Sequence, residues 1–177
     1  MIDTSKKFLV AGAGKSGIGS VNLLLKTGAD VSLYDGNEEL DKEALFEKLY
    51  EKKEISLVLG NITKEDIEKY DLLVLSPGIS VNAPIAQMFY DQEKPVWSEI
   101  ELAYQASKGK IAAITGTNGK TTTTALTGEI MKGYYESSFV VGNIGIPYTS
   151  VALDTQENSV ITAEISSFQL ETIVDFK

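Results

Sequence analysis

Two glycine-rich junctions between a strand and a helix constrain the fold of this chain most strongly. Residues 7–12 (KFLVAG) predict a buried strand, and residues 16–27 predict an amphipathic helix that ends at Gly28. Residues 110–115 and 119–132 predict a second strand and helix of the same kind. Because short strands lead directly into helices, we expect an α/β fold built on parallel sheets.

The remaining pattern predicts six further strands and two further helices. The expected strands cover 30–34, 55–59, 71–75, 94–97, 138–142 and 159–165, and the expected helices cover 38–53 and 84–91. A new strand–helix unit starts at Lys110, so we expect a domain boundary near Ser98. The prediction is a Rossmann-like domain over 1–98 and a P-loop-type domain over 99–177. With only about three strands, the second domain is expected to be incomplete.

The second glycine loop has the composition of a triphosphate-binding loop. It comprises Gly116, Thr117, Asn118, Gly119, Lys120, Thr121 and Thr122. Small glycines let backbone N–H groups converge on phosphate, and the following helix contributes its positive end. Lys120 can neutralise phosphate charge and the Thr121 hydroxyl can ligate Mg²⁺. The sequence therefore predicts ATP and Mg²⁺ as cofactors, although Ile114 stands where the usual motif has its first glycine. The alternative is a glycine turn without function.

The first glycine loop, Gly12–Gly17, matches the spacing G-x-G-x-x-G between a strand and a helix. Asp35 follows at the end of the second predicted strand. This combination is typical of a pyrophosphate site, with the acid facing a sugar or base. It does not distinguish NAD from a nucleotide-sugar diphosphate. The alternative is a glycine turn that serves only close helix–strand packing.

Three further groups follow predicted strands, at the edge where open α/β sheets bind ligands. Ser76-Pro77-Gly78 could contact a ligand or form a structural turn. Asn143, between two glycines, could orient a carboxylate or phosphate, or belong to a simple turn. Glu164 ends an apolar strand and is suited to Mg²⁺, because a buried, unpaired carboxylate is costly. Its alternative is an edge-strand position facing solvent.

Composition excludes several classes of function. The net charge is −9, and the chain has no arginine and no basic run, so we expect no nucleic-acid binding. No apolar run approaches the roughly 20 residues of a membrane span, and the N-terminus does not read as a signal peptide. We therefore expect a cytoplasmic protein without membrane insertion. The chain has neither histidine nor cysteine, which excludes disulfides and thiolate sites.

In this order, the motifs resemble those of the Mur ligases, the ATP-dependent amide-bond synthetases of peptidoglycan assembly. The resemblance covers the whole chain and is closest to the members that add D-glutamate to UDP-N-acetylmuramoyl-L-alanine. It rests on Gly12–Gly17, Ser76-Pro77-Gly78 and the segments 113–124 (AITGTNGKTTTT), 142–147 (GNIGIP) and 163–171 (AEISSFQLE). The short glycine spacing of the second loop is the form found in this family.

The resemblance implies a role for each motif. The first domain would bind the UDP substrate, with Gly14, Lys15, Ser16 and Gly17 at the diphosphate, Asp35 towards the uracil, and Ser76, Pro77 and Gly78 at the phosphate or sugar. Lys120 would bind the ATP phosphates, Thr121 and Glu164 would hold Mg²⁺, and Asn143 and Ser166 would flank the reacting groups. Some relatives carry a basic residue where this chain has Asn37.

The resemblance also implies that parts of such an enzyme are missing. A carbamylated lysine, a histidine near the second metal and a C-terminal domain have no counterpart here, so we expect a monomeric fragment without turnover. The sequence leaves three other readings open. They are an NAD-dependent oxidoreductase, a folylpolyglutamate-type synthetase, and a non-catalytic UDP-sugar-binding module.

Overall fold

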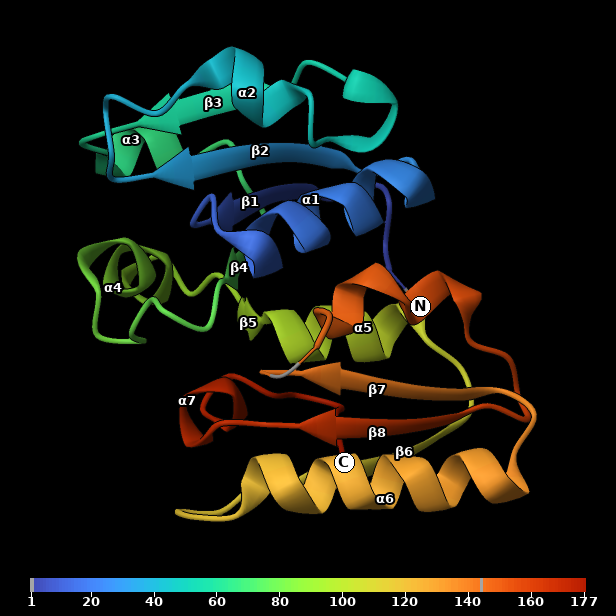
Figure 1. The fold of residues 1–177 in the computed structure, drawn as a ribbon. Coiled ribbons are helices and arrows are strands. Elements are labelled where there is room, and N and C mark those ends of the chain that lie inside the picture. Colours follow the sequence, from blue (N-terminus) through green and yellow to red (C-terminus); the bar gives the residue numbers. More distant parts are fainter. Residues whose placement is uncertain (1, 144) are drawn as a thin grey trace.

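The chain folds around two parallel sheets, as Figure 1 shows. The structure is a computed structural model that describes residues 2–143 and 145–177. The first sheet has the strand order β3-β2-β1-β4-β5 and the second has the order β6-β8-β7. Every described strand pair is parallel. The prediction of a parallel-sheet α/β fold is therefore confirmed.

The first sheet is buried on both faces. Its strands are β1 (Lys7–Ala11), β2 (Asp30–Asp35), β3 (Ser56–Leu59), β4 (Leu72–Leu75) and β5 (Val96–Ser98). Side chains alternate between the two faces, so Phe8 and Val10 join one apolar cluster while Leu9 and Ala11 join another. Burial on both faces explains why β1 and β4 are almost continuously hydrophobic.

Helices cover the two faces of this sheet. Residues of α1 (Lys15–Thr27) and α5 (Glu99–Ala106) pack into the cluster of Phe8 and Val10. Residues of α3 (Lys64–Ile67) and α4 (Pro84–Asp91) pack into the cluster of Leu9 and Ala11. Helix α1 ends at Gly28, whose φ of 82° is the left-handed conformation that glycine adopts readily.

The expected long helix over 38–53 is wrong. The segment instead contains a short helix, α2 (Lys42–Phe46), and a 3₁₀ turn, η1 (Tyr50–Lys52). Asp41 caps α2 by accepting a hydrogen bond from the Ala44 N–H at 3.0 Å. Glu51 and Lys52 then take positive φ values of 54° and 51°, which a helix cannot contain. The charged composition favoured a helix, but these left-handed residues break it.

The second sheet consists of β6 (Lys110–Ile114), β7 (Ser138–Gly142) and β8 (Val160–Glu164). Helix α6 (Lys120–Tyr134) lies along one face, where Gly128 contacts Val140 closely. The other elements are the 3₁₀ turns η2 (Tyr148–Ser150) and η3 (Ala152–Asp154) and the short helix α7 (Ser167–Leu170). Strand β8 is central, so the edge-strand alternative for Glu164 is wrong.

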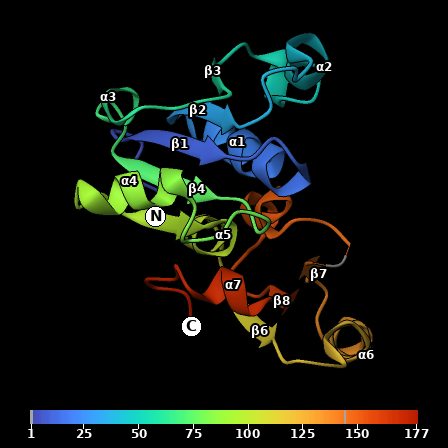
Figure 2. The same cartoon turned by 90° about the vertical axis from the view of Figure 1, so that its left-hand side faces the viewer.

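Helix α5, which the sequence pattern did not reveal, lies between the two sheets in both ribbon views (Figures 1 and 2). Ile100 and Leu102 are fully buried and belong to the apolar cluster of the first sheet. The same cluster continues into Val141, Tyr148 and Ile161 of the second half. The two sheets therefore share one hydrophobic core.

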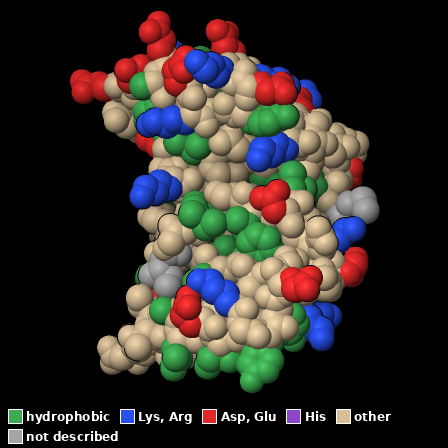
Figure 3. Space-filling model, turned by 45° about the vertical axis from the view of Figure 1, so that its right-hand side comes forward, with side chains coloured by type: hydrophobic (Ala, Val, Ile, Leu, Met, Phe, Trp, Pro, Cys, Tyr) green, Lys and Arg blue, Asp and Glu red, His purple; other side chains and the backbone are tan. Residues whose placement is uncertain are grey.

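The surface carries acids and lysines interspersed rather than one basic patch, as the face in Figure 3 shows. Hydrophobic side chains gather at the lower edge of this view, where α6 lies; Leu126, Ile130 and Tyr134 are exposed there. Within residues 2–143 and 145–177, no helix is both long and apolar enough to cross a membrane.

Candidate functional site

A cavity of about 610 Å³ opens between the carboxyl ends of the two sheets. One wall comes from the first sheet and the opposite wall from the loop after β7. Eight of the predicted substrate residues line it: Gly14, Lys15, Ser16, Asp35, Ser76, Pro77, Gly78 and Asn143. Gly17 and Ser166 do not line it. The sequence motifs of the two halves therefore meet in one site.

The glycine loop between β1 and α1 forms the centre of the first wall. Gly12 has a φ of 96°, and Gly17 packs so closely that a Cβ there would overlap the Gly12 carbonyl oxygen. These contacts bring the start of α1 against the end of β1. The first-turn N–H groups of α1 have no carbonyl partner within the helix, so they can bind an anion together with the helix dipole.

Asp35 braces this loop from the end of β2. Its Oδ2 accepts a hydrogen bond from the Ala13 N–H at 2.7 Å, and its Oδ1 accepts one from the Asn37 N–H at 2.9 Å. Each oxygen retains capacity for a further donor, since a carboxylate has about four acceptor positions. Asp35 thus fixes the loop in shape while its carboxylate still faces the cavity.

The turn after β4 completes the first wall. Ser76 Oγ donates to the Gly12 carbonyl at 3.4 Å, and the Ile79 N–H donates to the Ser76 carbonyl at 2.9 Å. In the order β3-β2-β1-β4-β5, β2 and β3 are added on one side of β1 and β4 and β5 on the other, so the strand order switches between β1 and β4. Such a switch point is where open α/β sheets bind ligands, so Ser76, Pro77 and Gly78 lie where the sequence predicted contacts.

The opposite wall is the loop after β7, which carries Asn143. Gly142 has a φ of 111°, and a Cβ there would overlap the Glu164 carbonyl oxygen. The Asn143 N–H donates to that same carbonyl at 3.2 Å. Gly145 and Pro147 continue the wall. Ile144, which belongs to the predicted motif, and Met1 of the first predicted domain lie outside the described residues.

The triphosphate-type loop lies at the same edge of the second sheet but outside the cavity. It follows β6, and Gly119 caps α6 with a φ of 75°. Gly116, Thr117, Asn118, Gly119, Thr121 and Thr122 are all exposed. Lys120 Nζ donates to the Gly116 carbonyl at 2.7 Å, so the lysine folds back over its own loop. The loop presents backbone N–H groups and hydroxyls to solvent, as a phosphate site requires.

Glu164 lies between the phosphate loop and Asn143. Its backbone pairs with Ile114 on one side and Gly142 on the other. The residue is 5% exposed, and its Oε2 has no hydrogen-bond partner. A buried carboxylate oxygen without a partner is costly, so the position fits a cation. No group of three or more acids that could hold a metal alone occurs in the described part of the chain. Further ligands would therefore come from hydroxyl, phosphate or water oxygens.

Ser166 caps a helix, a structural role that the prediction did not include. It caps α7: its Oγ donates to Gln169 Oε1 at 3.1 Å, and the same oxygen accepts the Ser166 N–H at 2.9 Å. This capping box directs the hydroxyl into the helix start. The structure therefore brings Ser166 to the edge of β8 but not into the cavity.

The sequence reasoning missed seven residues of the cavity. They are neighbours of the predicted ones in the same loops: Gly12, Ala13, Gly36, Ile79, Gly142, Gly145 and Pro147. Gly12, Ala13, Gly142, Gly145 and Pro147 lay within recognised motifs, which was a usable signal. Nothing in the pattern marked Gly36 or Ile79, because a glycine or an isoleucine beside a turn is ordinary.

Comparison with known proteins assigns the two halves to one family. Residues 6–98 match the model of the Mur ligase MurD-like N-terminal domain, and residues 114–177 match that of the Mur ligase middle domain. The second match begins at the last residue of β6 and includes the phosphate loop, Asn143 and Glu164.

Similar proteins of known name agree with this. The chain is 55% identical over 172 residues to UDP-N-acetylmuramoylalanine–D-glutamate ligase of Lachnospira eligens and 53% identical to that of Lachnoclostridium phytofermentans. Each match covers 97% of this chain and 38% of the relative, so the chain spans well under half of their length.

Solved structures show the same fold at lower identity. UDP-N-acetylmuramate-alanine ligase MurC from Thermotoga maritima matches with a TM-score of 0.50 and 22% identity, covering 91% of this chain and 37% of that one. A murein peptide ligase from Psychrobacter arcticus matches with a TM-score of 0.55 and 17% identity, covering 92% and 38%. With both halves matched by family models, this chain belongs to the Mur ligase family, with an N-terminal domain of the MurD-like type.

Proposed function

We propose that this chain is the substrate-binding and ATP-binding part of a ligase that adds D-glutamate to UDP-N-acetylmuramoyl-L-alanine. The observation that carries the proposal is the shared cavity, whose one wall is a pyrophosphate-type loop and whose other wall carries Asn143. The names of the most similar relatives support the choice of substrates. The D-glutamate partner rests on those names, because no residue described here selects an amino acid.

The first wall would hold the UDP part of the substrate. The N–H groups of Lys15 and Ser16 at the start of α1 line the cavity and would bind the diphosphate, helped by the helix dipole, with Gly17 directly behind them. Asp35 would face the uracil, and the turn Ser76–Gly78 would contact the phosphate or sugar. The lactoyl-alanyl arm would then extend across the cavity towards Asn143.

The second half would activate the alanyl carboxylate. Lys120 would leave the Gly116 carbonyl and bind the ATP phosphates, while Thr121 and Glu164 would hold Mg²⁺. The bound ion would reduce repulsion between the carboxylate and the triphosphate. The carboxylate oxygen would attack the γ-phosphorus, releasing ADP and forming an acyl phosphate. The amine of D-glutamate would then attack the acyl carbon, and inorganic phosphate would leave as the amide forms.

The division of labour follows the proposed domains, 1–98 and 99–177. Helix α5 begins just after this boundary, yet its Ile100 and Leu102 pack on the first sheet. We propose that α5 serves both domains as a shared element.

Since the chain spans 38% of the length of its relatives, the isolated 177-residue chain is expected to bind ligands without turnover. Release of ADP that depends on D-glutamate would contradict this expectation. Monomeric state and cytoplasmic location stay predictions.

Isothermal titration of the 177-residue chain tests the proposed substrate. We expect saturable binding of UDP-N-acetylmuramoyl-L-alanine and none of NADH. Binding of NADH without binding of the UDP compound would favour the oxidoreductase reading. Binding of the UDP compound without binding of MgATP would favour a non-catalytic UDP-sugar module.

The proposed cation site is tested through Glu164. In the presence of ATP, the Glu164→Gln variant should retain less protein-bound Mn²⁺ in electron paramagnetic resonance spectra than the unmodified chain. Glu157→Gln is the matched control, because Glu157 lies before β8 with 86% of its side chain exposed. Equal Mn²⁺ retention in both variants would rule out Glu164 as a metal ligand.

A further inference from the structure

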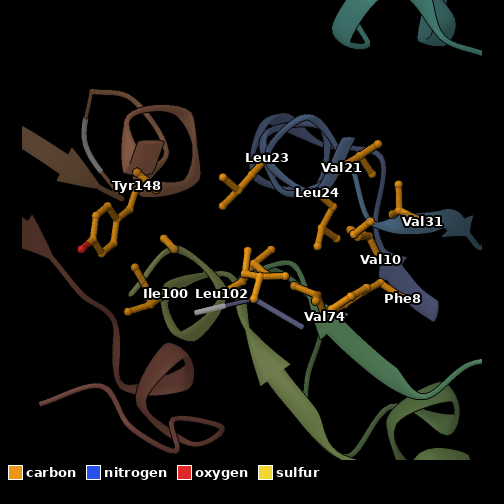
Figure 4. Close-up of a cluster of buried hydrophobic side chains, with 14 of the residues drawn as sticks. Phe8, Val10, Val21, Leu23, Leu24, Val31, Val74, Ile100, Leu102 and Tyr148 are labelled. Atoms are coloured by element: carbon orange, nitrogen blue, oxygen red, sulfur yellow. The ribbon is translucent and has the colours of Figure 1, made fainter. Parts of the chain in front are cut away.

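The short turn η2 is hydrogen-bonded to both ends of helix α5. At the N-terminal end, Glu99 Oε1 accepts hydrogen bonds from the Thr149 N–H and from Thr149 Oγ1, both at 2.9 Å. At the C-terminal end, the Tyr148 hydroxyl and Ser107 Oγ lie 2.5 Å apart. Figure 4 shows the Tyr148 ring beside Ile100, with the Leu23 side chain extending from α1 towards them. Neighbouring residues of one turn thus bind opposite ends of one helix.

Glu99 is an unusual residue to find in this position. It is 1% exposed, and burial raises the pKa of its carboxyl group, while the Thr149 and Tyr148 donors oppose that rise. A buried carboxylate stabilises only when donors surround it, and here the donors all come from η2. Apolar packing alone could join α5 to η2. The acid adds a directional link that fixes where Thr149 sits.

The position of η2 sets the position of the second cavity wall. Pro147, which lines the cavity, directly precedes Tyr148. On its other side, η2 contacts α1: a Cβ on Gly19 would come within 2.7 Å of Thr149 Oγ1. The start of α1 is the centre of the first wall. Turn η2 is therefore wedged between α1 and α5, and it carries one cavity wall at a fixed distance from the other.

We propose that Glu99 is a positioning residue for the substrate: through Thr149 it fixes the Asn143 wall opposite the diphosphate wall. This inference rests on the proposed function, because it assumes that the substrate spans the cavity. UDP alone would contact mainly the first wall. UDP-N-acetylmuramoyl-L-alanine would need both walls at the correct separation.

The same helix offers a matched control. Glu101 is also fully buried, and it also accepts hydrogen bonds from backbone N–H groups, those of Val174 at 2.8 Å and Phe176 at 3.0 Å. Neither Glu101 nor the segment that it holds lines the cavity. Loss of either carboxylate perturbs a buried acid on α5, but only Glu99 acts on the cavity wall.

The experiment compares Glu99→Leu with Glu101→Leu, which remove the acceptor oxygens at similar side-chain volume, by calorimetric titration with UDP and with UDP-N-acetylmuramoyl-L-alanine, at a temperature where both variants are folded. We expect Glu99→Leu to weaken binding of the full substrate about tenfold while changing UDP affinity less than twofold. Glu101→Leu should leave both affinities within twofold. Thr149→Val should reproduce the loss, and Thr149→Ser, which keeps the hydroxyl, should restore binding.

Each outcome has a defined meaning. Equal losses for both ligands, or equal effects of the Glu99 and Glu101 variants, would overturn the positioning role and leave the proposed function intact. If the unmodified chain binds neither ligand, the proposed function fails and this inference fails with it. If Glu99→Leu does not fold, the pair Thr149→Val and Thr149→Ser decides by the same criteria.

Discussion

The two glycine loops of this chain follow the same plan, yet they are supported very differently. The loop Gly12–Gly17 is braced by Asp35, by Ser76 and by contact between its own first and last glycines. The loop Gly116–Thr121 is exposed along most of its length, and the Lys120 ammonium group donates a hydrogen bond to the Gly116 carbonyl of the same loop. The first loop holds its binding shape through its neighbours. We expect the lysine of the second loop to make new contacts when a phosphate ligand replaces the Gly116 carbonyl as its partner.

The largest expected effect comes from adding one methyl group to each loop. Gly17→Ala places a Cβ on the Gly12 carbonyl oxygen, so it should reduce the free energy of unfolding by about 3 kcal/mol or more. Gly119→Ala meets no atom within 4 Å and bears only the strain of its positive φ, about 1 to 2 kcal/mol. Urea denaturation followed by circular dichroism measures both. Equal losses would mean that the second loop is braced as well.

Removing the lysine of the exposed loop should separate binding from stability. Lys120→Met should weaken MgATP binding about a hundredfold, because a charged phosphate contact is lost. Unfolding free energy should change by less than about 0.5 kcal/mol, since the side chain is bonded only to an exposed carbonyl. Lys132→Met, in the last turn of the same helix, is the control and should leave MgATP affinity unchanged. A large stability loss in Lys120→Met would show that the fold-back bond supports the loop.

Weakening the hydrogen bonds that support the first loop should, in contrast, lower the stability of the fold. Asp35→Asn keeps the side-chain shape but replaces one of the two carboxylate oxygens that accept the Ala13 and Asn37 N–H groups, at a cost of about 1 to 2 kcal/mol in stability. Asp30→Asn is a control on the same strand, because its exposed pair with Lys7 at 3.8 Å contributes less than about 1 kcal/mol. Chemical denaturation of both variants measures the difference. Equal stabilities would contradict the bracing role.

The smallest expected effect is the pH dependence of stability that comes from Glu99, the residue that bonds turn η2. Burial raises the folded-state pKa of Glu99 above its ordinary 4.5, so the folded protein retains a proton that the unfolded chain releases. Its contribution to stability is full below 4.5 and is lost as pH rises through the folded pKa. Melting temperature should therefore fall more steeply above pH 4.5 in the unmodified chain than in Glu99→Gln. Parallel curves would show that Glu99 does not titrate differently on folding.

The sequence predicted the loops well because their geometry is local. Gly12, Gly17 and Gly116 are required by turns only a few residues long, and the flanking strands had clear apolar runs. Glu164 was also recognisable, since an acid that ends an apolar strand is rare. The helix prediction for 38–53 was wrong because its charges favour a helix. In the structure the Asn22 side chain bonds the Lys48 carbonyl and the Tyr50 N–H instead, and Glu51 takes a positive φ.

The features that join the two halves could not be predicted in this way. The cavity depends on how one sheet sits against the other, and no local pattern encodes that arrangement. Helix α5 was missed although Ser98 and Glu101 have the spacing of a capping box. In the structure Ser98 Oγ accepts the Glu101 N–H at 3.3 Å, but the Glu101 carboxylate bonds residues 174–176 instead. The capping sequence was therefore present, but the contact of Glu101 with residues 174–176 could not be predicted from it.

The shared core around α5 has a consequence for cooperativity. Ile100 and Leu102 complete the core of the first sheet, while Glu99 and Glu101 of the same helix hold segments of the second half. Neither sheet can lose this helix without exposing apolar surface of the other, so the chain should melt in a single calorimetric transition. A gene fragment that stops at residue 98 would remove Ile100 and Leu102 from the core of the first sheet, whereas one that stops after Ser107 would retain them.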